Sequence, residues 1–198
     1  MFRMPDPGTI LAEPKKKRFT REEYDKMVEI GLLEGQHVEL IDGEIIQMAP
    51  QLNRHAVTVG LVDRALRRVV GDQYWVRLQA PINASEDSEP EPDVAIVTGS
   101  PRDYSEHPRK PLLVVEVSET MYRFDSRTKA GLYASVGIED YWIVNLNANR
   151  LEVYREPVAD ETKPFAHRYA DVKMLAATEV VTCLAFPQAQ IKVADLLP

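Results

Sequence analysis

The spacing of apolar residues along the chain predicts three helices. A capping box formed by Thr20 and Glu23 begins the first of them. Over residues 53–70 apolar side chains recur at steps of three and four, which places them on one helical face, and Asn53 is the expected N-cap. Residues 125–136 repeat the same spacing. The pattern therefore predicts amphipathic helices that each cover one face of a core.

Alternating and continuous apolar runs predict β-strands between these helices. Residues 38–48 alternate around Asp42-Gly43, the strongest local signal for a tight hairpin. Residues 112–117 form a continuous β-branched run, which is typical of a central strand buried on both faces. Further strands are expected at residues 74–79, 94–97, 141–146 and 151–155, with short β structure after residue 164. Together the elements predict an α/β fold with an N-terminal helix and hairpin.

The composition favours a single domain over residues 1–198, of which residues 1–18 form an irregular arm. A hydrophobic content of 44% is enough for one sizeable core. No apolar run is long enough to span a bilayer and no signal-peptide core is present, so no membrane partner is expected. The only cysteine, Cys183, lies in an apolar stretch and is expected to be a buried hydrophobe. A cytoplasmic location is the resulting expectation.

The net charge and the absence of several known motifs exclude some classes of function. A net charge of −7 argues against a protein that coats nucleic acid, because such binding depends on neutralising phosphates. It does not argue against a nuclease, since a metal-dependent site is itself a group of carboxylates. The sequence has no phosphate-binding loop, no dinucleotide-binding glycine pattern, no nucleophile elbow and no cysteine–histidine spacing suited to zinc.

Two carboxylates point to metal chemistry. Glu116 lies in the predicted central strand, and a buried glutamate needs a cation, a metal or a proton. A structural salt bridge is the alternative explanation. Asp93 directly precedes the strand predicted at residues 94–97, and it lies beside Glu116 if that strand and the central strand are neighbours. Paired carboxylates repel each other unless a divalent cation lies between them, and Mg²⁺ accepts few protein oxygens and keeps several waters.

Other polar residues are candidates for the same site, each with a structural alternative. Lys129 shares the apolar face of its helix, where it either reaches the site, extends its ammonium into solvent or pairs with Asp125. His55, in the first turn of its helix, is a site residue or a satisfied core histidine. Glu39 is a metal-site carboxylate or an exposed edge-strand residue. Arg64, Arg67 and Arg68 more often form a solvated face than a DNA track.

Several motifs in order resemble the Uma family of restriction endonucleases, long catalogued as a domain of unknown function. The matching stretches include residues 38–45, 88–94, 113–118 and 125–129, and the resemblance covers residues 19–157. It implies a restriction-endonuclease-like core of the PD-(D/E)XK superfamily, a mixed central β-sheet flanked by helices.

The resemblance also implies roles for individual residues. Asp93 and Glu116 take the two acidic positions of the superfamily pattern, whereas Ser118 stands where its lysine is usual. Uma-like proteins share this departure and take the lysine from the following helix, here at Lys129. Glu39 and His55 also fall on positions that recur in the family.

These observations lead to the hypothesis of a Mg²⁺-dependent endonuclease, with Mn²⁺ as a substitute ion, that acts on DNA. Asp93, Glu116 and the carbonyl of Val117 would hold the metal, Glu39 would complete a second position, and His55 would contact phosphate. A homodimer would allow both strands of a duplex to be cut. The alternatives are an inactive module of the same fold that binds nucleic acid or protein, and a phosphohydrolase that acts on small nucleotides.

Overall fold

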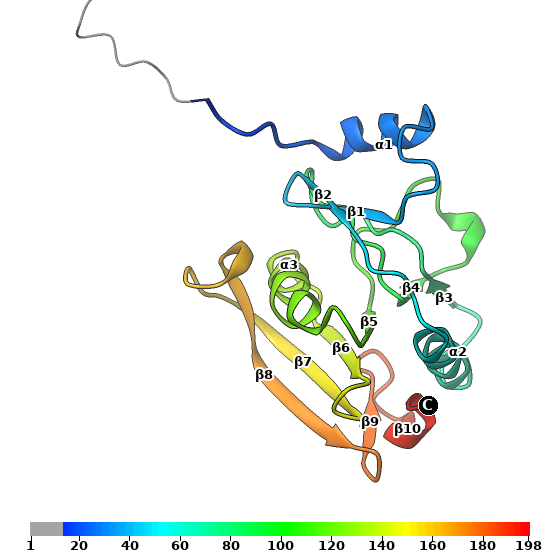
Figure 1. Ribbon diagram of the computed structural model, residues 1–198. Helices are drawn as coiled ribbons and strands as arrows, with labels where there is room; N and C mark the ends of the chain where they lie inside the picture. Colours follow the sequence, from blue (N-terminus) through cyan, green and yellow to red (C-terminus); the bar gives the residue numbers. More distant parts are fainter. Residues whose placement is uncertain (1–13) are drawn as a thin grey trace, which may run out of the picture.

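The computed structural model describes residues 14–198, so most of the predicted N-terminal arm lies outside the described residues. A six-stranded sheet forms the centre of the molecule (Figure 1). Its strands, from one edge to the other, are β3 (Tyr74–Leu78), β4 (Val94–Thr98), β5 (Leu113–Ser118), β6 (Asp140–Asn145), β7 (Arg150–Ala159) and β8 (His167–Ala176). Strands β5 and β6 are parallel and the other neighbours are antiparallel. The sheet is therefore mixed, as predicted.

Helices and two small sheets surround the central sheet. The helices are α1 (Arg21–Glu29), α2 (Asn53–Arg67), the π-helix η2 (Phe124–Lys129) and its continuation α3 (Ala130–Ser135). Short 3-10 turns occupy η1 (Pro101–Asp103), η3 (Pro164–Ala166) and η4 (Val193–Leu196). One small sheet is the hairpin of β1 (Val38–Ile41) and β2 (Glu44–Gln47), and the other pairs β9 (Val180–Thr182) with β10 (Gln190–Lys192). None of the helices within residues 14–198 combines the length and apolarity needed to cross a membrane.

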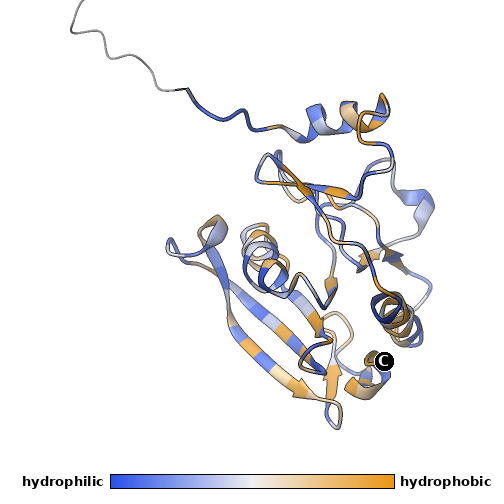
Figure 2. Ribbon diagram, in the orientation of Figure 1, coloured by the Kyte–Doolittle hydropathy of each residue, from blue (hydrophilic) through white to orange (hydrophobic). Residues whose placement is uncertain are grey.

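Two hydrophobic cores lie on opposite faces of the central sheet. In β5, Leu113, Val115 and Val117 pack into the core that α2 covers. Val114, which points to the other face, packs into the core that α3 covers. Figure 2 shows the corresponding alternation of apolar and polar residues along β7 and β8. Because Glu116 has the same parity as Val114, its side chain points to the α3 face.

The hairpin agrees with its sequence signal. Asp42 and Gly43 both have positive φ, 51° and 70°, as a type I′ turn requires. A Cβ atom on Gly43 would lie 2.6 Å from the Cβ of Arg18, so the close approach of the arm also demands glycine here. This turn holds β1 in place, and β1 carries Glu39 into the site described below.

Three local predictions were wrong in detail. Asn53 does not cap α2: the N-cap is Leu52, which is extended, so Asn53 is already the first helical residue. The helix expected at residues 125–136 begins as the π-helix η2, a rare form that is found frequently at functional sites. The tail holds a ten-residue strand, β8, rather than only short strands. It pairs with β7 along the whole length of both strands.

Candidate active site

The register of the central sheet brings Asp93 and Glu116 together. Antiparallel pairing sets Val94 opposite Val115, so the residue before β4 stands beside Glu116. The Asp93 backbone N–H lies 3.4 Å from Glu116 Oε2, and the Val117 N–H donates to Asp93 Oδ2 at 2.8 Å. Both carboxylates are buried. The condition set from sequence, that the two strands be neighbours, is therefore met.

Lys129 enters the same site from η2. Its ammonium donates to Glu116 Oε1 at 2.9 Å and to Glu39 Oε1 at 3.0 Å, and only 2% of the residue is exposed. It neither reaches into solvent nor pairs with Asp125, the two alternatives considered from the sequence. Glu39 is 2% exposed, so the expectation of a solvated edge-strand carboxylate is wrong for it. Its second oxygen, Oε2, is buried and has no hydrogen-bond partner within residues 14–198.

His55 contacts Asp93 from the first turn of α2. The ring Nε2 lies 2.9 Å from Asp93 Oδ1, and burial lowers the pKa of the imidazole. A neutral ring that donates its Nε2 proton to the carboxylate fits both observations. His55 is thus placed to orient Asp93, and its Nε2 is already occupied rather than free for a phosphate.

Two residues that were not predicted as members of the site complete it. The Tyr133 hydroxyl, on α3, donates to Glu116 Oε1 at 2.8 Å. Asp125, on η2, accepts a 2.7 Å bond from Ser118, the residue at the usual lysine position. Both side chains are buried. Their spacing from Lys129, four residues on either side, was the available signal, because residues four apart share a helical face.

Several carboxyl groups lie close together around the single ammonium group of Lys129, and their burial and crowding shift their pKa values. Burial, reinforced by the charge of Glu116, raises the pKa of Asp93 well above its usual range. Burial also raises the pKa of Glu39 to about 7 and that of Asp125 to about 7. Burial alone would lower the pKa of Lys129, but the surrounding carboxylates raise it well above its usual range. Lys129 alone therefore does not compensate these carboxyl groups, which keep their protons to a higher pH than usual.

These residues fit a hard divalent cation. Within the described chain no three His, Cys, Asp or Glu side chains are arranged as a complete metal cage. The available donors are the neighbouring carboxylates of Asp93 and Glu116, with the unpartnered oxygen of Glu39 close by through Lys129. Mg²⁺ suits so small a set, because it binds through one or two carboxylates and keeps waters and substrate oxygens for the remainder.

A small cavity of about 70 Å³ opens onto this site. His55, Asp93, Glu116 and Lys129 line it. His37 and Glu91 also line it, and they border a second, much larger groove on the side of α1. The cavity admits water or a small group, whereas a larger substrate has to lie across its mouth.

Comparison with models of known protein families shows to which family the chain belongs. The sequence model of Uma2, described as putative restriction endonuclease, matches residues 21–194. The chain is a member of the Uma2 family. The family assignment agrees with the resemblance drawn from the motifs. No protein of curated function matches this Uma2 chain.

One solved structure supports the fold of this Uma2 protein. A crystal structure of a putative nuclease of Anabaena variabilis, from the DUF820 family, superposes with a TM-score of 0.67 at 16% identity and covers 90% of this chain and 97% of its own. The type IIG restriction endonuclease BpuSI matches with a TM-score of 0.35 at 18% identity, over 61% of this chain and 14% of its own. The first comparison shows that the Uma2 chain has the fold of that nuclease.

A pH-dependent stability is expected from Glu89, which borders the larger groove of this Uma2 protein. Burial, with the nearby charge of Asp25, raises the pKa of Glu89 to about 7, above the value in an unfolded chain. The unfolded state therefore releases this proton first, so the free energy of unfolding falls as the pH rises from about 4.5 to about 7 and then levels off. Relative to Glu89→Gln, wild type should lose on the order of 2 kcal/mol over this window. Urea unfolding at several pH values measures it, and parallel pH profiles for the two proteins would contradict it.

Proposed function

We propose that this protein is a metal-dependent endonuclease that hydrolyses DNA phosphodiester bonds at Asp93 and Glu116. One observation carries the proposal: two buried carboxylates, one directly before β4 and one on the neighbouring β5, stand side by side, and a fully buried lysine is bonded to one of them. Membership of the Uma2 family and a nuclease fold support the same reaction class.

The proposal gives the metal to a defined set of residues. Asp93, Glu116 and the carbonyl oxygen of Val117 would hold Mg²⁺, or Mn²⁺ in its place, and the bound ion would lower the pKa of water and polarise the phosphate. Burial of the carboxylates serves this purpose, because a low-dielectric site strengthens their attraction for a cation. His55 holds Asp93 through Oδ1 while the Val117 N–H holds Oδ2, which fixes the carboxylate plane.

Lys129 supplies the positive charge from the chain itself. Its ammonium, fixed between Glu39 and Glu116, is oriented before any substrate arrives. A preorganised cation stabilises the charge that develops on a phosphoryl group without reorganisation during the reaction. Glu39 thus acts as a positioning residue for Lys129, and its free oxygen remains available for a second metal position.

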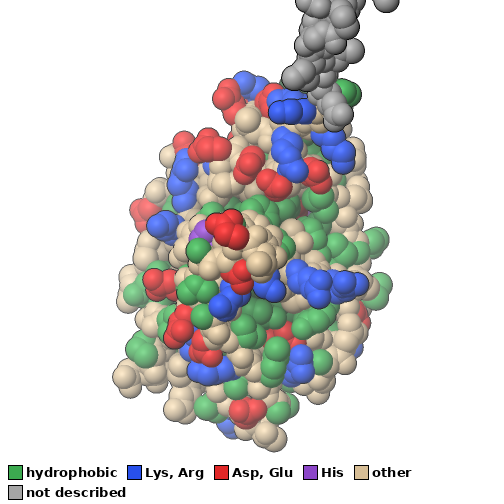
Figure 3. Space-filling model, turned by 90° about the vertical axis from the view of Figure 1, so that its left-hand side faces the viewer, with side chains coloured by type: hydrophobic (Ala, Val, Ile, Leu, Met, Phe, Trp, Pro, Cys, Tyr) green, Lys and Arg blue, Asp and Glu red, His purple; other side chains and the backbone are tan. Residues whose placement is uncertain are grey.

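DNA has to reach the site through local contacts rather than a broad basic surface. Figure 3 shows acidic and basic side chains interspersed over the face it presents, without a continuous basic tract among the described residues drawn there. Of Arg64, Arg67 and Arg68, the arginines considered from the sequence, Arg67 is engaged with Asp63 and with the Val76 carbonyl. Because few phosphates would be neutralised, cleavage is expected to weaken only moderately with salt. A homodimer would place two sites on one duplex.

Metal binding should depend on Asp93. Calorimetric titration of Mg²⁺ or Mn²⁺ is expected to give a saturable isotherm with wild type and none with Asp93→Ala, because the substitution removes one of two ligand carboxylates. Incubation with supercoiled plasmid should then show nicking by wild type alone.

The control for this titration is Asp171→Ala, a change on β8 remote from the site, which should bind metal and nick like wild type. DNA binding without metal binding in wild type would instead indicate an inactive module of this fold. Release of phosphate from nucleotides, with plasmid left intact, would indicate a small-molecule phosphohydrolase.

A further inference from the structure

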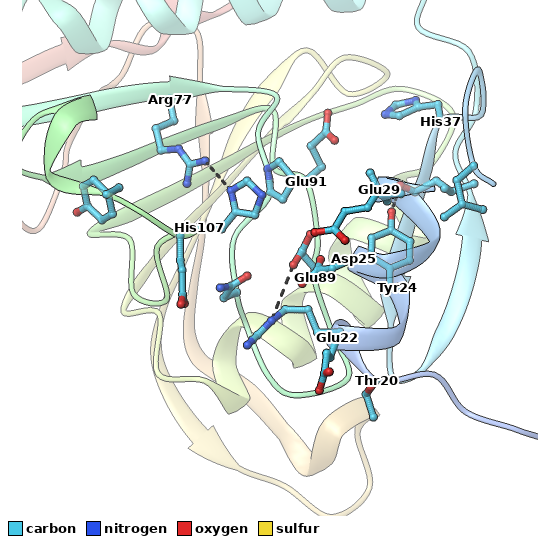
Figure 4. Close-up of a pocket in the computed structure, with 18 of the residues that line it drawn as sticks. Thr20, Glu22, Tyr24, Asp25, Glu29, His37, Arg77, Glu89, Glu91 and His107 are labelled. Atoms are coloured by element: carbon cyan, nitrogen blue, oxygen red, sulfur yellow. Dashed lines mark hydrogen bonds and ion pairs between the residues drawn. The ribbon is translucent and has the colours of Figure 1, made fainter. Parts of the chain in front are cut away.

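A large acidic groove lies beside the candidate active site. Its volume is about 1320 Å³, and α1, the loop before β4 and the segment around η1 form its walls (Figure 4). It is separate from the nuclease cavity, with which it shares only the bordering residues His37 and Glu91. None of Asp93, Glu116 or Lys129 lines it.

Negative charge dominates this groove. Eight acidic side chains and two arginines line it. Glu22, Asp25 and Glu29 come from α1, while Glu89 and Glu91 come from the loop that leads to β4. Figure 4 shows the carboxylates of Asp25, Glu29 and Glu89 directed toward the same space. Such a field repels the phosphates of nucleic acid and attracts cations.

Buried polar atoms without partners mark the floor of the groove. Asn83 and Glu89 are each 5% exposed, and Asn83 Oδ1 and Glu89 Oε2 accept no hydrogen bond within residues 14–198. The Arg21 guanidinium, 4.0 Å from Glu89 Oε2, is too far away to satisfy it. Arg77 is also 5% exposed, and its Nε and Nη1 donate to no acceptor in the described chain. Unpartnered buried polar atoms are costly, so a ligand that supplies both donors and acceptors would stabilise this surface.

We propose that this groove binds an extended, lysine- or arginine-rich peptide segment of a partner protein. The cationic side chains of the segment would donate to Glu89, Asn83 and the α1 carboxylates. Its backbone carbonyls would accept from Arg77, which lies over the Trp75 ring at 4.9 Å and beside His107. The negative charge of the groove would thus select cationic side chains in the peptide, and Arg77 would hold the peptide backbone.

The size and charge of the groove favour this occupant over the others. Pockets for small molecules enclose roughly 300 to 1,000 Å³, so the volume of the groove is larger than one such ligand needs. A nucleic acid would bring phosphates against eight acidic side chains. A basic peptide satisfies the carboxylates and also provides acceptors for Arg77.

Trp75 gives a local signal for the test. The protein has two tryptophans, and Trp142 is fully buried in the core while Trp75 lines the groove. A blocked peptide of alternating lysine and glycine should change the tryptophan emission of the full chain in a saturable way, more strongly at low salt. The corresponding glutamate peptide should have no effect, and Trp75→Phe should remove the signal.

A charge-matched pair of variants decides whether the groove is responsible. Asp25→Asn combined with Glu89→Gln is expected to weaken binding of the lysine peptide at least about tenfold. Glu161→Gln combined with Asp171→Asn removes the same net charge outside the groove and should leave the affinity unchanged. Circular dichroism checks that both double variants are folded.

Three results would overturn the proposal. Equal affinities for the two double variants would show that only net charge attracts the peptide. Peptide binding without any change in Trp75 emission would place it elsewhere. Binding of a single-stranded oligonucleotide that quenches Trp75 and is lost in Arg77→Gln would assign the groove to nucleic acid. Since no residue of the nuclease site is altered, failure here would leave the proposed cleavage untouched.

Discussion

Replacing Glu116 by glutamine is expected to lower DNA nicking about a thousandfold while the protein stays folded. Glutamine has the same shape and can still accept from Lys129 and Tyr133, which both bond Glu116 Oε1. It lacks the charge that a divalent cation requires from this position. The substitution therefore separates the chemical role of the residue from its packing.

The measurement is the initial rate of plasmid nicking at saturating Mg²⁺, with circular dichroism and thermal unfolding on the same samples. Glu152→Gln is the matched control, because Glu152 is equally buried, lies on the same sheet and bonds Arg150, Asn145 and Tyr154 rather than the site. This control should lose stability but keep nicking at temperatures where it is folded. An unfolded Glu116→Gln protein would mean that Glu116 is a structural carboxylate.

Replacing Lys129 by methionine is expected to cost about 3 to 5 kcal/mol of unfolding free energy at neutral pH and above. The side chain is fully buried between Glu39 and Glu116, and methionine fills the space without the charge. Two carboxylates would then remain buried with no cation between them. Removing one partner of a buried ion pair costs more than the pair contributes, because the remaining charge has lost its solvation.

Urea unfolding of a double-mutant cycle tests this explanation. Glu39→Gln in the Lys129→Met background should restore part of the lost stability, since it removes one of the two uncompensated charges. At acid pH the difference in unfolding free energy between Lys129→Met and wild type should become smaller. The pKa of Glu39 is already raised to about 7 in wild type, and loss of the neighbouring ammonium raises it further. Glu39 is therefore neutral at low pH and no longer needs a cation beside it. A gap that is constant with pH, or a cycle with no coupling, would contradict the charge argument.

The candidate site could be predicted from the sequence where its signals were local. Glu116 in a continuous β-branched run and Asp93 at the start of a strand were sufficient to propose a pair of carboxylates, and the structure places them beside each other. The helical spacing also placed Lys129 on a buried face. These predictions succeeded because the side-chain period of a strand or helix is fixed by the backbone and is visible in any short window.

Other members of the site depended on contacts between distant segments. Glu39 lies 90 residues from Lys129 in the sequence, and its place in a hairpin was equally consistent with an exposed edge-strand residue. The bond between His55 and Asp93 spans 38 residues, so no local pattern in the sequence indicates it. The spacing of apolar residues within a helix or strand does not indicate which other element its buried face contacts.

The sequence by itself determined the α/β class, the hairpin at Asp42-Gly43 and the two acidic residues around which the site is built. The tertiary structure alone decided the order of the six strands, the π-helical turn that directs Lys129 and Asp125 inward, and the acidic groove beside α1. The physical reason is the range of the forces involved. Backbone sterics and burial act within a few residues, whereas the pairing of buried charges is settled only when the whole chain has packed.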